Sequence, residues 1–205
     1  MGYDIDPISE NCYPNTTVLI NKLDIRDEET LNEAETLATF INASKLEQLP
    51  LEGAFDFAHY KAVHYFLFSD LYDWAGQIRT VNISKKGTGF CPADEIEERA
   101  ALIFSRLKEK DFFQKLPHDA FVDEIVDFYC ATNNLHPFRE GNGRTQRAFL
   151  TQLIRNAGYD ISFGDMDVDL LMIATIQSAN GVTDLLRRVL DDAMSSVMET
   201  NEQHH

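Results

Sequence analysis

Cysteine is scarce in this sequence, with three residues in 205: Cys12, Cys91 and Cys130. Their number is odd and they lie far apart. The sequence therefore predicts neither a disulfide framework nor the paired spacing of a zinc site. We expect reduced thiols and a protein of a reducing compartment, the cytoplasm.

Positive charge is scarce as well. Lysine and arginine number 18 against 34 aspartate and glutamate residues, which gives a formal net charge of -16. Nucleic acids and anionic membranes both attract basic surfaces, so we expect neither of them as a partner. A nucleotide can still bind to an acidic protein at a place where arginines gather.

Long apolar runs are also missing. No stretch approaches the roughly 20 apolar residues of a membrane span. The opening residues, MGYDIDPISEN, contain no apolar run of the kind found in signal peptides. The acidic residues that follow Gly2 do not fit a myristoylation site.

No repeat, low-complexity tract or linker divides the chain, so we expect a single domain over residues 1–205. Apolar residues recur at helical spacing along most of it, which predicts a mainly α fold. Gly158 stands where a helix would need a C-terminal cap. The expected helices are one that begins after Asp27 and carries Leu31, Ala34, Leu37, Ala38 and Ile41 on one face, and others over about 54–69, 93–110, 117–134, 145–157, 166–179 and 182–198.

Residues 54–69 are apolar nearly all round, which favours a helix buried on most sides. His64 lies within this run. A histidine in such surroundings is more often a hydrogen-bonded core residue than a catalyst, so we predict a structural role for it.

Residues 78–91 break the helical pattern. The stretch is rich in β-branched residues and then turns at Lys85-Lys86-Gly87-Thr88-Gly89, which predicts a short hairpin. A lone hairpin on a helical protein has an exposed edge, and such an edge can pair with an extended segment of a partner. The alternative is a plain connecting hairpin.

The densest cluster of functional residue types is HPFREGNGRTQR, residues 136–147. Glycines let backbone N–H groups approach phosphate oxygens, so a turn of Gly141, Asn142 and Gly143 suits a polyphosphate. Arg144 and Arg147 are three apart on the helix expected after the turn, and their planar side chains match phosphate geometry. Lys85 and Lys86 are possible helpers.

Two further residues of this stretch suit a transfer reaction at a phosphate. Glu140 offers hard oxygen ligands for a magnesium ion that bridges phosphates. His136 is the natural general base, because its unperturbed pKa lies near neutrality. Phe138 has no evident chemical role, and we expect it to anchor the loop in the core.

The stretch resembles the signature HPFx[D/E]GNGRxxR of Fic-domain proteins at every fixed position. Asp73-Trp74-Ala75-Gly76, Arg79 and Asn82-Ile83-Ser84-Lys85 are similar to the family segment that leads into its hairpin flap. The resemblance covers most of the chain. It implies a helical bundle of about seven or eight helices with one β-hairpin flap, an N-terminal extension over about 1–25, the signature loop at 136–147 and the flap at about 78–91.

The resemblance implies transfer of AMP from ATP to a Ser, Thr or Tyr hydroxyl of a target protein. His136 would take the hydroxyl proton, and Glu140 would hold Mg²⁺. The flap residues Asn82, Ile83 and Ser84 would hold the target. Gln177 and Asn180 are candidates for contact with the adenine and ribose.

The N-terminal stretch from Tyr13 to Leu23 is similar to the stand-alone bacterial toxin branch, which is restrained by a small antitoxin carrying an [S/T]xxxE[G/N] helix. In that inhibition the glutamate pairs with an arginine of the signature, here Arg144. Ser195 to Glu199 fits SxxxE, but Thr200 follows where Gly or Asn is expected. We therefore favour a separate antitoxin. The branch makes a type II topoisomerase subunit a candidate target, while delivery into another cell stays open.

Two alternatives remain at this point. Some relatives transfer phosphate or phosphocholine, although these usually alter the GNGR segment or the acidic position. The chain could also be a catalytically silent binding module that uses the flap to hold a partner.

Overall fold

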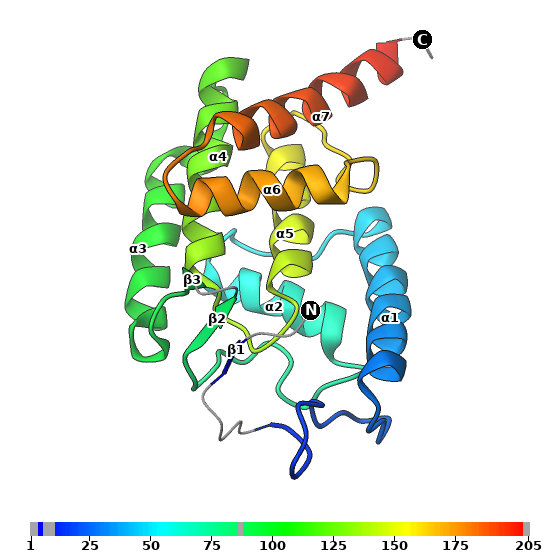
Figure 1. Cartoon of the computed structure of the whole chain (residues 1–205). Helices are drawn as coiled ribbons and strands as arrows, with labels where there is room; N and C mark the ends of the chain where they lie inside the picture. Colours follow the sequence, from blue (N-terminus) through cyan, green and yellow to red (C-terminus); the bar gives the residue numbers. More distant parts are fainter. Residues whose placement is uncertain (1–3, 6–10, 86–87, 203–205) are drawn as a thin grey trace. The chain divides into compact units, whose positions relative to one another are not determined.

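The computed structural model describes residues 4–5, 11–85 and 88–202, and these form a mainly α-helical protein (Figure 1). The predicted fold class is confirmed. The helices are α1 (Glu28–Gln48), α2 (Phe57–Phe68), α3 (Ile96–Glu109), α4 (His118–Leu135), α5 (Asn142–Asn156), α6 (Val168–Ala179) and α7 (Asp184–Glu202). The strands are β1 (Asp4–Ile5), β2 (Ile83–Lys85) and β3 (Thr88–Gly89), and two 3₁₀ turns cover Ala93–Glu95 and Asp111–Phe113.

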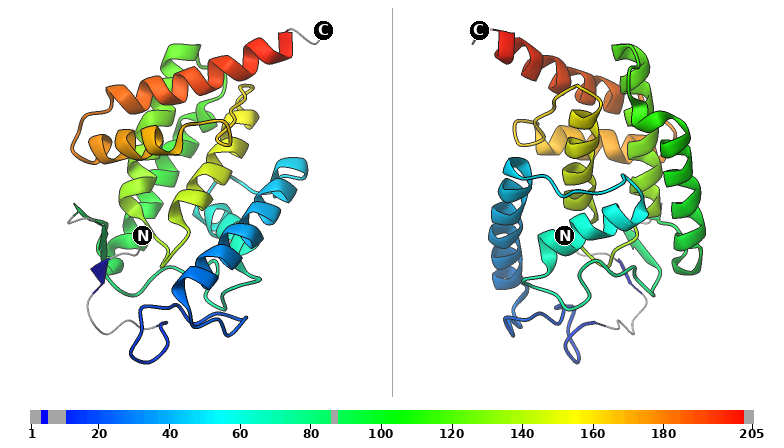
Figure 2. Two further views of the ribbon diagram at one scale, coloured as in Figure 1. Left: turned by 45° about the vertical axis from the view of Figure 1, so that its right-hand side comes forward. Right: turned by 180° about the vertical axis from the view of Figure 1, so that it is seen from behind.

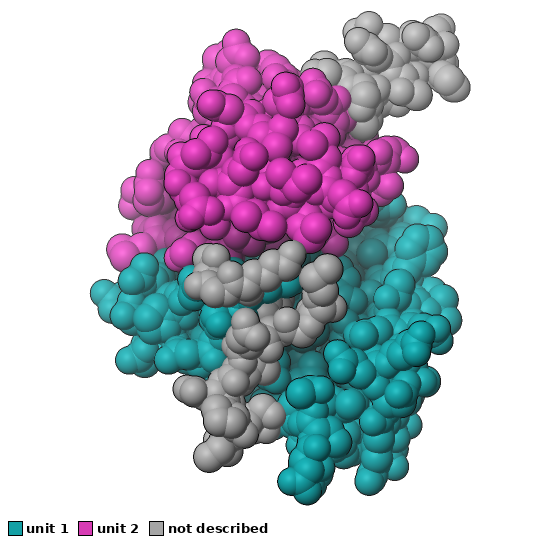
Figure 3. Space-filling view, in the orientation of Figure 1, with its two compact units in different colours: residues 1–101, 135–145 teal, residues 102–134, 146–205 magenta. Residues whose placement is uncertain are grey.

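The chain divides into two compact units, coloured separately in Figure 3. Unit 1 comprises Met1–Ala101 and Leu135–Thr145, and unit 2 comprises Leu102–Asn134 and Gln146–His205. The expectation of a single domain stays a prediction. Most of the signature loop belongs to unit 1, so that unit contains most of the candidate site.

Helix α1 begins where the sequence predicts. The Asp27 side chain accepts a hydrogen bond from the Thr30 N–H, as an N-cap should. The apolar face predicted for this helix, however, is not the face that the structure buries. Leu37 and Ile41 are exposed, whereas the buried residues of this helix are Leu31, Glu35, Thr39, Asn42 and Leu46.

The polar residues on the buried face of α1 all have partners. The Asn42 amide donates to the Leu67 carbonyl and to Asp70, and Thr39 and Glu35 contact groups of the candidate site. Burying polar groups costs little when their hydrogen bonds are satisfied. The helix therefore turns a polar stripe inward, and it packs against α2, as Figure 2 shows.

Helix α2 buries one broad face rather than most of its surface. Tyr65 in its middle is 59% exposed, so the expectation of burial on most sides was too strong. The buried face presents aromatic rings to the signature loop. Its members are His59, Tyr60, Val63, His64, Leu67 and Phe68.

The predicted hairpin exists, but it is not alone. Strand β2 pairs with β3 on one side and with β1 on the other, so the sheet order is β1-β2-β3. Ile5 lies opposite Ile83 and Asp4 opposite Ser84, in antiparallel register. The edge of β2 that we expected to be exposed is thus covered by the chain's own N-terminal residues. Nothing in the sequence of this two-residue strand indicated the pairing.

Unit 2 is built around aromatic side chains. The rings of Phe104, Phe128 and Phe149 lie with centroids 5.7 to 6.0 Å apart, and α6 packs against α7. Gly158 has a φ of +89° just after α5, so the predicted cap glycine is confirmed. No helix in the described part of the chain combines the length and apolar character that crossing a membrane requires.

Candidate active site in the signature loop

His136 follows the last residue of α4, at the start of the signature loop. Its backbone has a φ of +43°, an uncommon value for a residue with a side chain. Its carbonyl oxygen accepts a hydrogen bond of 2.8 Å from Arg79 Nε, and its ring stacks on Phe90 with centroids 3.7 Å apart. The histidine side chain is therefore fixed between the loop and the flap segment.

Arg79 holds this arrangement in place. It is 4% exposed, and its guanidinium also donates to the backbone carbonyls of Val81 and Cys91. Its own N–H donates to the Pro137 carbonyl at 2.8 Å. Since each of these acceptors is a backbone oxygen, Arg79 serves the shape of the site rather than a ligand. The sequence showed Arg79 only through the family resemblance.

The side chains of Asn142 and Phe138 brace the loop from within. The Asn142 amide donates to the Phe138 carbonyl at 2.8 Å, and its oxygen accepts from the Phe138 N–H at 2.9 Å. The Phe138 ring is fully buried and stacks on His64 and Tyr60. Phe138 is the predicted anchor. The Asn142 side chain is engaged within the loop, so only its backbone is available to a phosphate.

Helix α5 starts earlier than predicted, so Gly143 and Arg144 lie in its first turn. Its first helical hydrogen bond runs from the Thr145 N–H to the Gly141 carbonyl. The N–H groups of residues 142–144 therefore precede the helical ladder, at the positive end of the helix dipole. This is a favourable place for a phosphate.

Gly141 can only be glycine here. Its φ is +80°, and a Cβ atom would lie 2.2 Å from the Phe68 ring. Its N–H donates to Glu140 Oε1 at 2.8 Å, so in this structure that donor turns to the carboxylate rather than outward.

Glu140 is a half-buried carboxylate, with a side chain that is 26% exposed and one oxygen still available. Burial raises the pKa of its carboxyl group and the charge of Glu35 raises it further, while the Gly141 N–H, Arg144 and Lys85 act in the opposite direction. In the described part of the chain both hydrogen bonds of the carboxylate go to Oε1, which leaves Oε2 for another ligand.

The donor set around Glu140 fits magnesium bound together with a nucleotide. No group of three or more His, Cys, Asp or Glu side chains among the described residues could hold a metal by itself. Mg²⁺ in nucleotide sites commonly takes one or two carboxylates, with phosphates and waters completing the octahedron. One accessible carboxylate oxygen next to a helix start meets that requirement.

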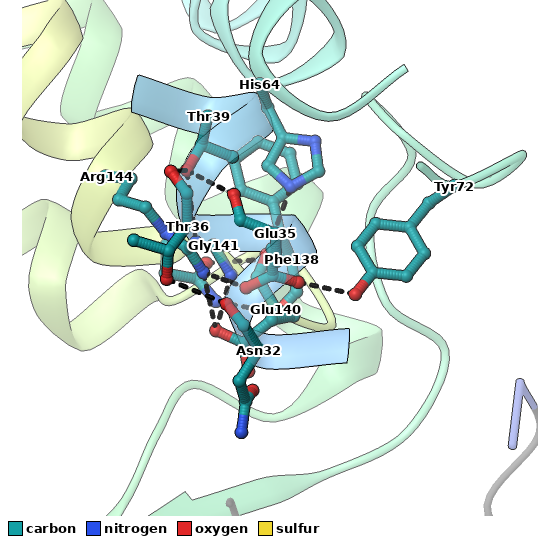
Figure 4. Close-up of polar contacts among 11 residues, drawn as sticks. Asn32, Glu35, Thr36, Thr39, His64, Tyr72, Phe138, Glu140, Gly141 and Arg144 are labelled. Carbon is teal, nitrogen blue, oxygen red and sulfur yellow. Dashed lines mark hydrogen bonds and ion pairs between the residues drawn. The ribbon is translucent and has the colours of Figure 1, made fainter. Parts of the chain in front are cut away.

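Arg144 is already paired in this structure, as Figure 4 shows. Its guanidinium forms an ion pair with Glu35 of α1 and lies 3.5 Å from Glu140 Oε1. The other oxygen of Glu35 accepts a hydrogen bond of 2.5 Å from the Tyr72 hydroxyl. No sequence pattern indicated Glu35 or Tyr72. Glu35 is one of several glutamates on the same predicted helix, and no spacing distinguishes it from the others.

His64 links α2 to the loop, and its predicted structural role is confirmed. Its Nδ1 accepts a hydrogen bond of 2.8 Å from the Gly76 N–H, so Nε2 must carry the proton and donate to the Glu140 carbonyl at 3.1 Å. Burial, more than any other cause, lowers the pKa of His64 to about 4. The neutral ring thus holds the backbone of the metal-binding candidate.

We expect His64 to make folding stability depend on pH. Its pKa in the folded state lies below the ordinary value of 6.5, so the unfolded chain binds the proton first. The contribution of neutral His64 is complete above about pH 6.5. It is lost as the pH falls toward 4. As the pH is lowered to about 4, the free energy of unfolding measured in urea should decrease roughly 3 kcal/mol more for the wild type than for His64→Asn. Parallel pH curves for the two proteins would contradict this assignment.

The remaining predicted site residues lie elsewhere or outside the described part. Lys85 is in β2 and acts on Glu140 through its charge, whereas Lys86 is not among the described residues. The side chain of Glu199 is not among them either. The residues Arg147, Gln177 and Asn180 belong to unit 2, and their contacts with a nucleotide stay predictions.

Comparisons with known proteins agree with this site. A family model described as Fic/DOC matches residues 54–154. The chain is 40% identical over 177 residues to a Sinorhizobium fredii protein named probable protein adenylyltransferase y4lH, covering 86% of this chain and 89% of the relative. It is 35% identical over 188 residues to the Salmonella typhimurium protein named probable protein adenylyltransferase Fic, covering 92% and 93%.

A solved Fic-domain structure also resembles this chain. The N-terminal Fic domain of a VirB-translocated Bep effector protein from Bartonella quintana, with bound ADP, has a TM-score of 0.84 to this chain at 27% identity. The match covers 89% of this chain and 93% of that chain. With two relatives above 30% identity over most of its length, and with an intact signature loop, this chain belongs to the Fic/DOC family.

Proposed function

We propose that this chain is a protein adenylyltransferase, which transfers AMP from ATP to a serine, threonine or tyrosine hydroxyl of a target protein. The observation that carries the proposal is the loop geometry in unit 1. There a histidine held by Arg79 and Phe90, a half-buried carboxylate and the start of α5 lie within one stretch of residues 136–144. The names of the relatives and the ADP bound to the solved neighbour support the same reaction class.

In the proposed reaction His136 accepts the proton of the target hydroxyl. The hydroxyl oxygen forms a bond to the α-phosphorus of ATP, the bond from that phosphorus to its bridging oxygen breaks, and pyrophosphate leaves. The N–H groups of Asn142 and Gly143 orient the phosphates, with Arg144 and Arg147 beside the β- and γ-phosphates. As in other phosphoryl-type transfers, the chain mainly positions groups and stabilises charge.

Glu140 would hold a magnesium ion, and this ion would offset the negative charge that develops on pyrophosphate. Lys85 and Lys86 would add positive charge at the phosphates. Gln177 and Asn180 would contact the adenine and ribose.

The target would be held at the flap by backbone groups. The Asn82 side chain accepts a hydrogen bond of 2.8 Å from the Ala93 N–H, and the Ile83 side chain is 3% exposed. The Ile83 side chain is therefore not placed to contact a target, whereas Asn82 is exposed and keeps its amide N–H groups for one. Strand pairing along β2, which includes Ser84, needs only the main chain. A target that pairs on the outer edge of β2 would have to replace β1.

The test is incubation of the purified chain with labelled ATP and a bacterial lysate, followed by mass spectrometry of modified proteins. The proposal requires a hydroxyl residue that has gained the mass of AMP. Gain of phosphate or phosphocholine would instead favour the other transfer reactions. Nucleotide binding without magnesium-dependent turnover would favour a silent binding module.

We also propose that the chain is a bacterial toxin restrained by a separate small antitoxin, with a type II topoisomerase subunit as its target. Its similarity to the short toxin branch supports this. The glutamate that pairs with Arg144 in the structure is Glu35, and its neighbours do not form [S/T]xxxE[G/N], because Leu31 stands four residues before it and Thr36 follows. In the proposed inhibition, the glutamate of the antitoxin would pair with Arg144 in place of Glu35.

We expect the purified chain to be active without a partner, and Glu199→Gly to change its rate little. If Glu199 restrained an arginine of the site, its removal would release a charge-assisted pair worth about 1.5 to 3 kcal/mol. A quiet wild-type enzyme whose adenylylation rate rises roughly 10- to 100-fold in Glu199→Gly would therefore contradict the antitoxin model. The measurement is the initial rate of labelling at equal concentrations of the two proteins.

A further inference from the structure

Arg144 is shared between two carboxylates that come from different parts of unit 1. Its Nη2 is ion-paired with Glu35 Oε1 and lies 3.5 Å from Glu140 Oε1. The contact with Glu35 is the closer one. How the guanidinium is divided between the two acids decides how much of Glu140 remains available to another cation.

Glu35 is held firmly in its place. Its side chain is 8% exposed, and its second oxygen accepts the hydrogen bond from the Tyr72 hydroxyl. Tyr72 is itself 1% exposed. A buried carboxylate with a partner on each oxygen has little freedom, so Glu35 is a fixed point and not a mobile surface acid.

Arg144 is also held on the Glu35 side. Its Nη1 donates to Thr39 Oγ1 at 3.3 Å, and Thr39 lies one turn beyond Glu35 on α1. Its Cζ lies 4.9 Å from the centre of the Phe68 ring, within cation–π range. Three contacts thus draw the guanidinium toward α1 and α2, as the close-up in Figure 4 shows for the two α1 residues.

Without Glu35 the guanidinium would have another partner at hand. Glu140 and Arg144 are four residues apart, and the existing 3.5 Å separation needs only a small movement to close. Arginine and carboxylate form bidentate pairs that engage both oxygens. Such a pair would occupy Oε2 of Glu140, the oxygen that is left open in this structure.

We propose that Glu35 is a positioning residue, which holds Arg144 away from Glu140 and so keeps the Glu140 carboxylate open to a divalent cation. The two acids and one arginine together carry a net negative charge, which favours the cation as well. The inference rests on the proposed function, because that function assigns the cation to Glu140.

The test measures metal binding directly. Mn²⁺ replaces Mg²⁺ as a paramagnetic probe, and its binding to the full chain is followed by electron paramagnetic resonance with a non-hydrolysable ATP analogue present. Replacing a direct partner of a metal ligand typically weakens metal binding about 10- to 100-fold. Glu35 acts one contact further out, through Arg144, so Glu35→Gln should raise the Kd for Mn²⁺ about tenfold, at the lower end of that range. Tyr72→Phe should raise it less, because Glu35 keeps its charge and loses only one hydrogen bond.

Two further variants distinguish an incorrect metal site from an incorrect role of Glu35. Glu33→Gln removes the same charge from an exposed position of α1, and we expect wild-type Mn²⁺ affinity. Glu140→Gln should weaken Mn²⁺ binding far more than Glu35→Gln does. If Glu140→Gln binds Mn²⁺ like the wild type, the proposed metal site itself is wrong. If Glu140→Gln loses binding while Glu35→Gln behaves like Glu33→Gln, only the role of Glu35 is wrong.

Thermal unfolding of each variant completes the design. Glu35 is buried, and its replacement could prevent folding. In that event Tyr72→Phe carries the test, since it keeps the ring and both charges. A folded Tyr72→Phe with unchanged Mn²⁺ affinity would then overturn the proposal.

Discussion

Replacing His136 with alanine is expected to lower the rate of AMP transfer about 10²- to 10⁴-fold, the usual cost of removing a general base. The ring is fixed by its stacking on Phe90 and by the bond from Arg79 to its backbone. The methyl group of alanine leaves the backbone bond intact, so nucleotide binding should persist. The loss should therefore fall on kcat.

The measurements for this variant are the single-turnover rate of target labelling and the Kd for an ATP analogue. His118→Ala serves as the matched control, because His118 pairs with Asp191 in unit 2 and has no part in the loop. Its labelling rate should equal that of the wild type. Near-normal labelling by His136→Ala would show that another group takes the proton.

Replacing Glu140 with glutamine should be at least as costly. A metal ion supplies several kcal/mol of stabilisation to the transition state, which corresponds to about 10²-fold in rate or more. Glutamine retains an oxygen for the Gly141 N–H but removes the charge, so the loop should keep its shape. We expect a large rise in the Mg²⁺ concentration needed for half-maximal activity, with partial rescue at high Mg²⁺.

The rate of adenylylation as a function of Mg²⁺ concentration checks this expectation. Glu52→Gln is the control, since Glu52 is an exposed acid of unit 1 outside the loop. If Glu140→Gln shows the wild-type Mg²⁺ dependence, Glu140 does not bind the metal.

Local patterns predicted the ends of the elements better than their buried faces. Asp27, Gly158 and the start of α4 after Pro117 behave as their capping chemistry dictates. The inward face of α1 was missed, because the sequence rule assumes that apolar residues turn inward. Here Glu35 and the neighbouring polar positions are buried because distant residues supply their hydrogen bonds.

The sequence likewise identified only some residues of the candidate site. His136 and Glu140 could be identified from one short stretch, because residue type and spacing there determine the chemistry. The residues that hold them could not. Arg79 and Tyr72 are far away in sequence, and their bonds to the loop and to Glu35 depend on the packed fold. Their roles depend on where they lie in the folded protein, and a single sequence does not show that location.

The pairing of β1 with β2 has a consequence for the choice of target. A segment on the same chain competes with a free partner at an effective concentration that is typically millimolar for a short connection. In the proposed binding mode a target loop must displace Asp4 and Ile5 from Ser84 and Ile83. Extended peptides that offer only main-chain bonds gain no advantage over this tethered strand. Only a protein with additional contacts to the enzyme would be modified, so the N-terminal strand would act as a threshold for substrate recognition.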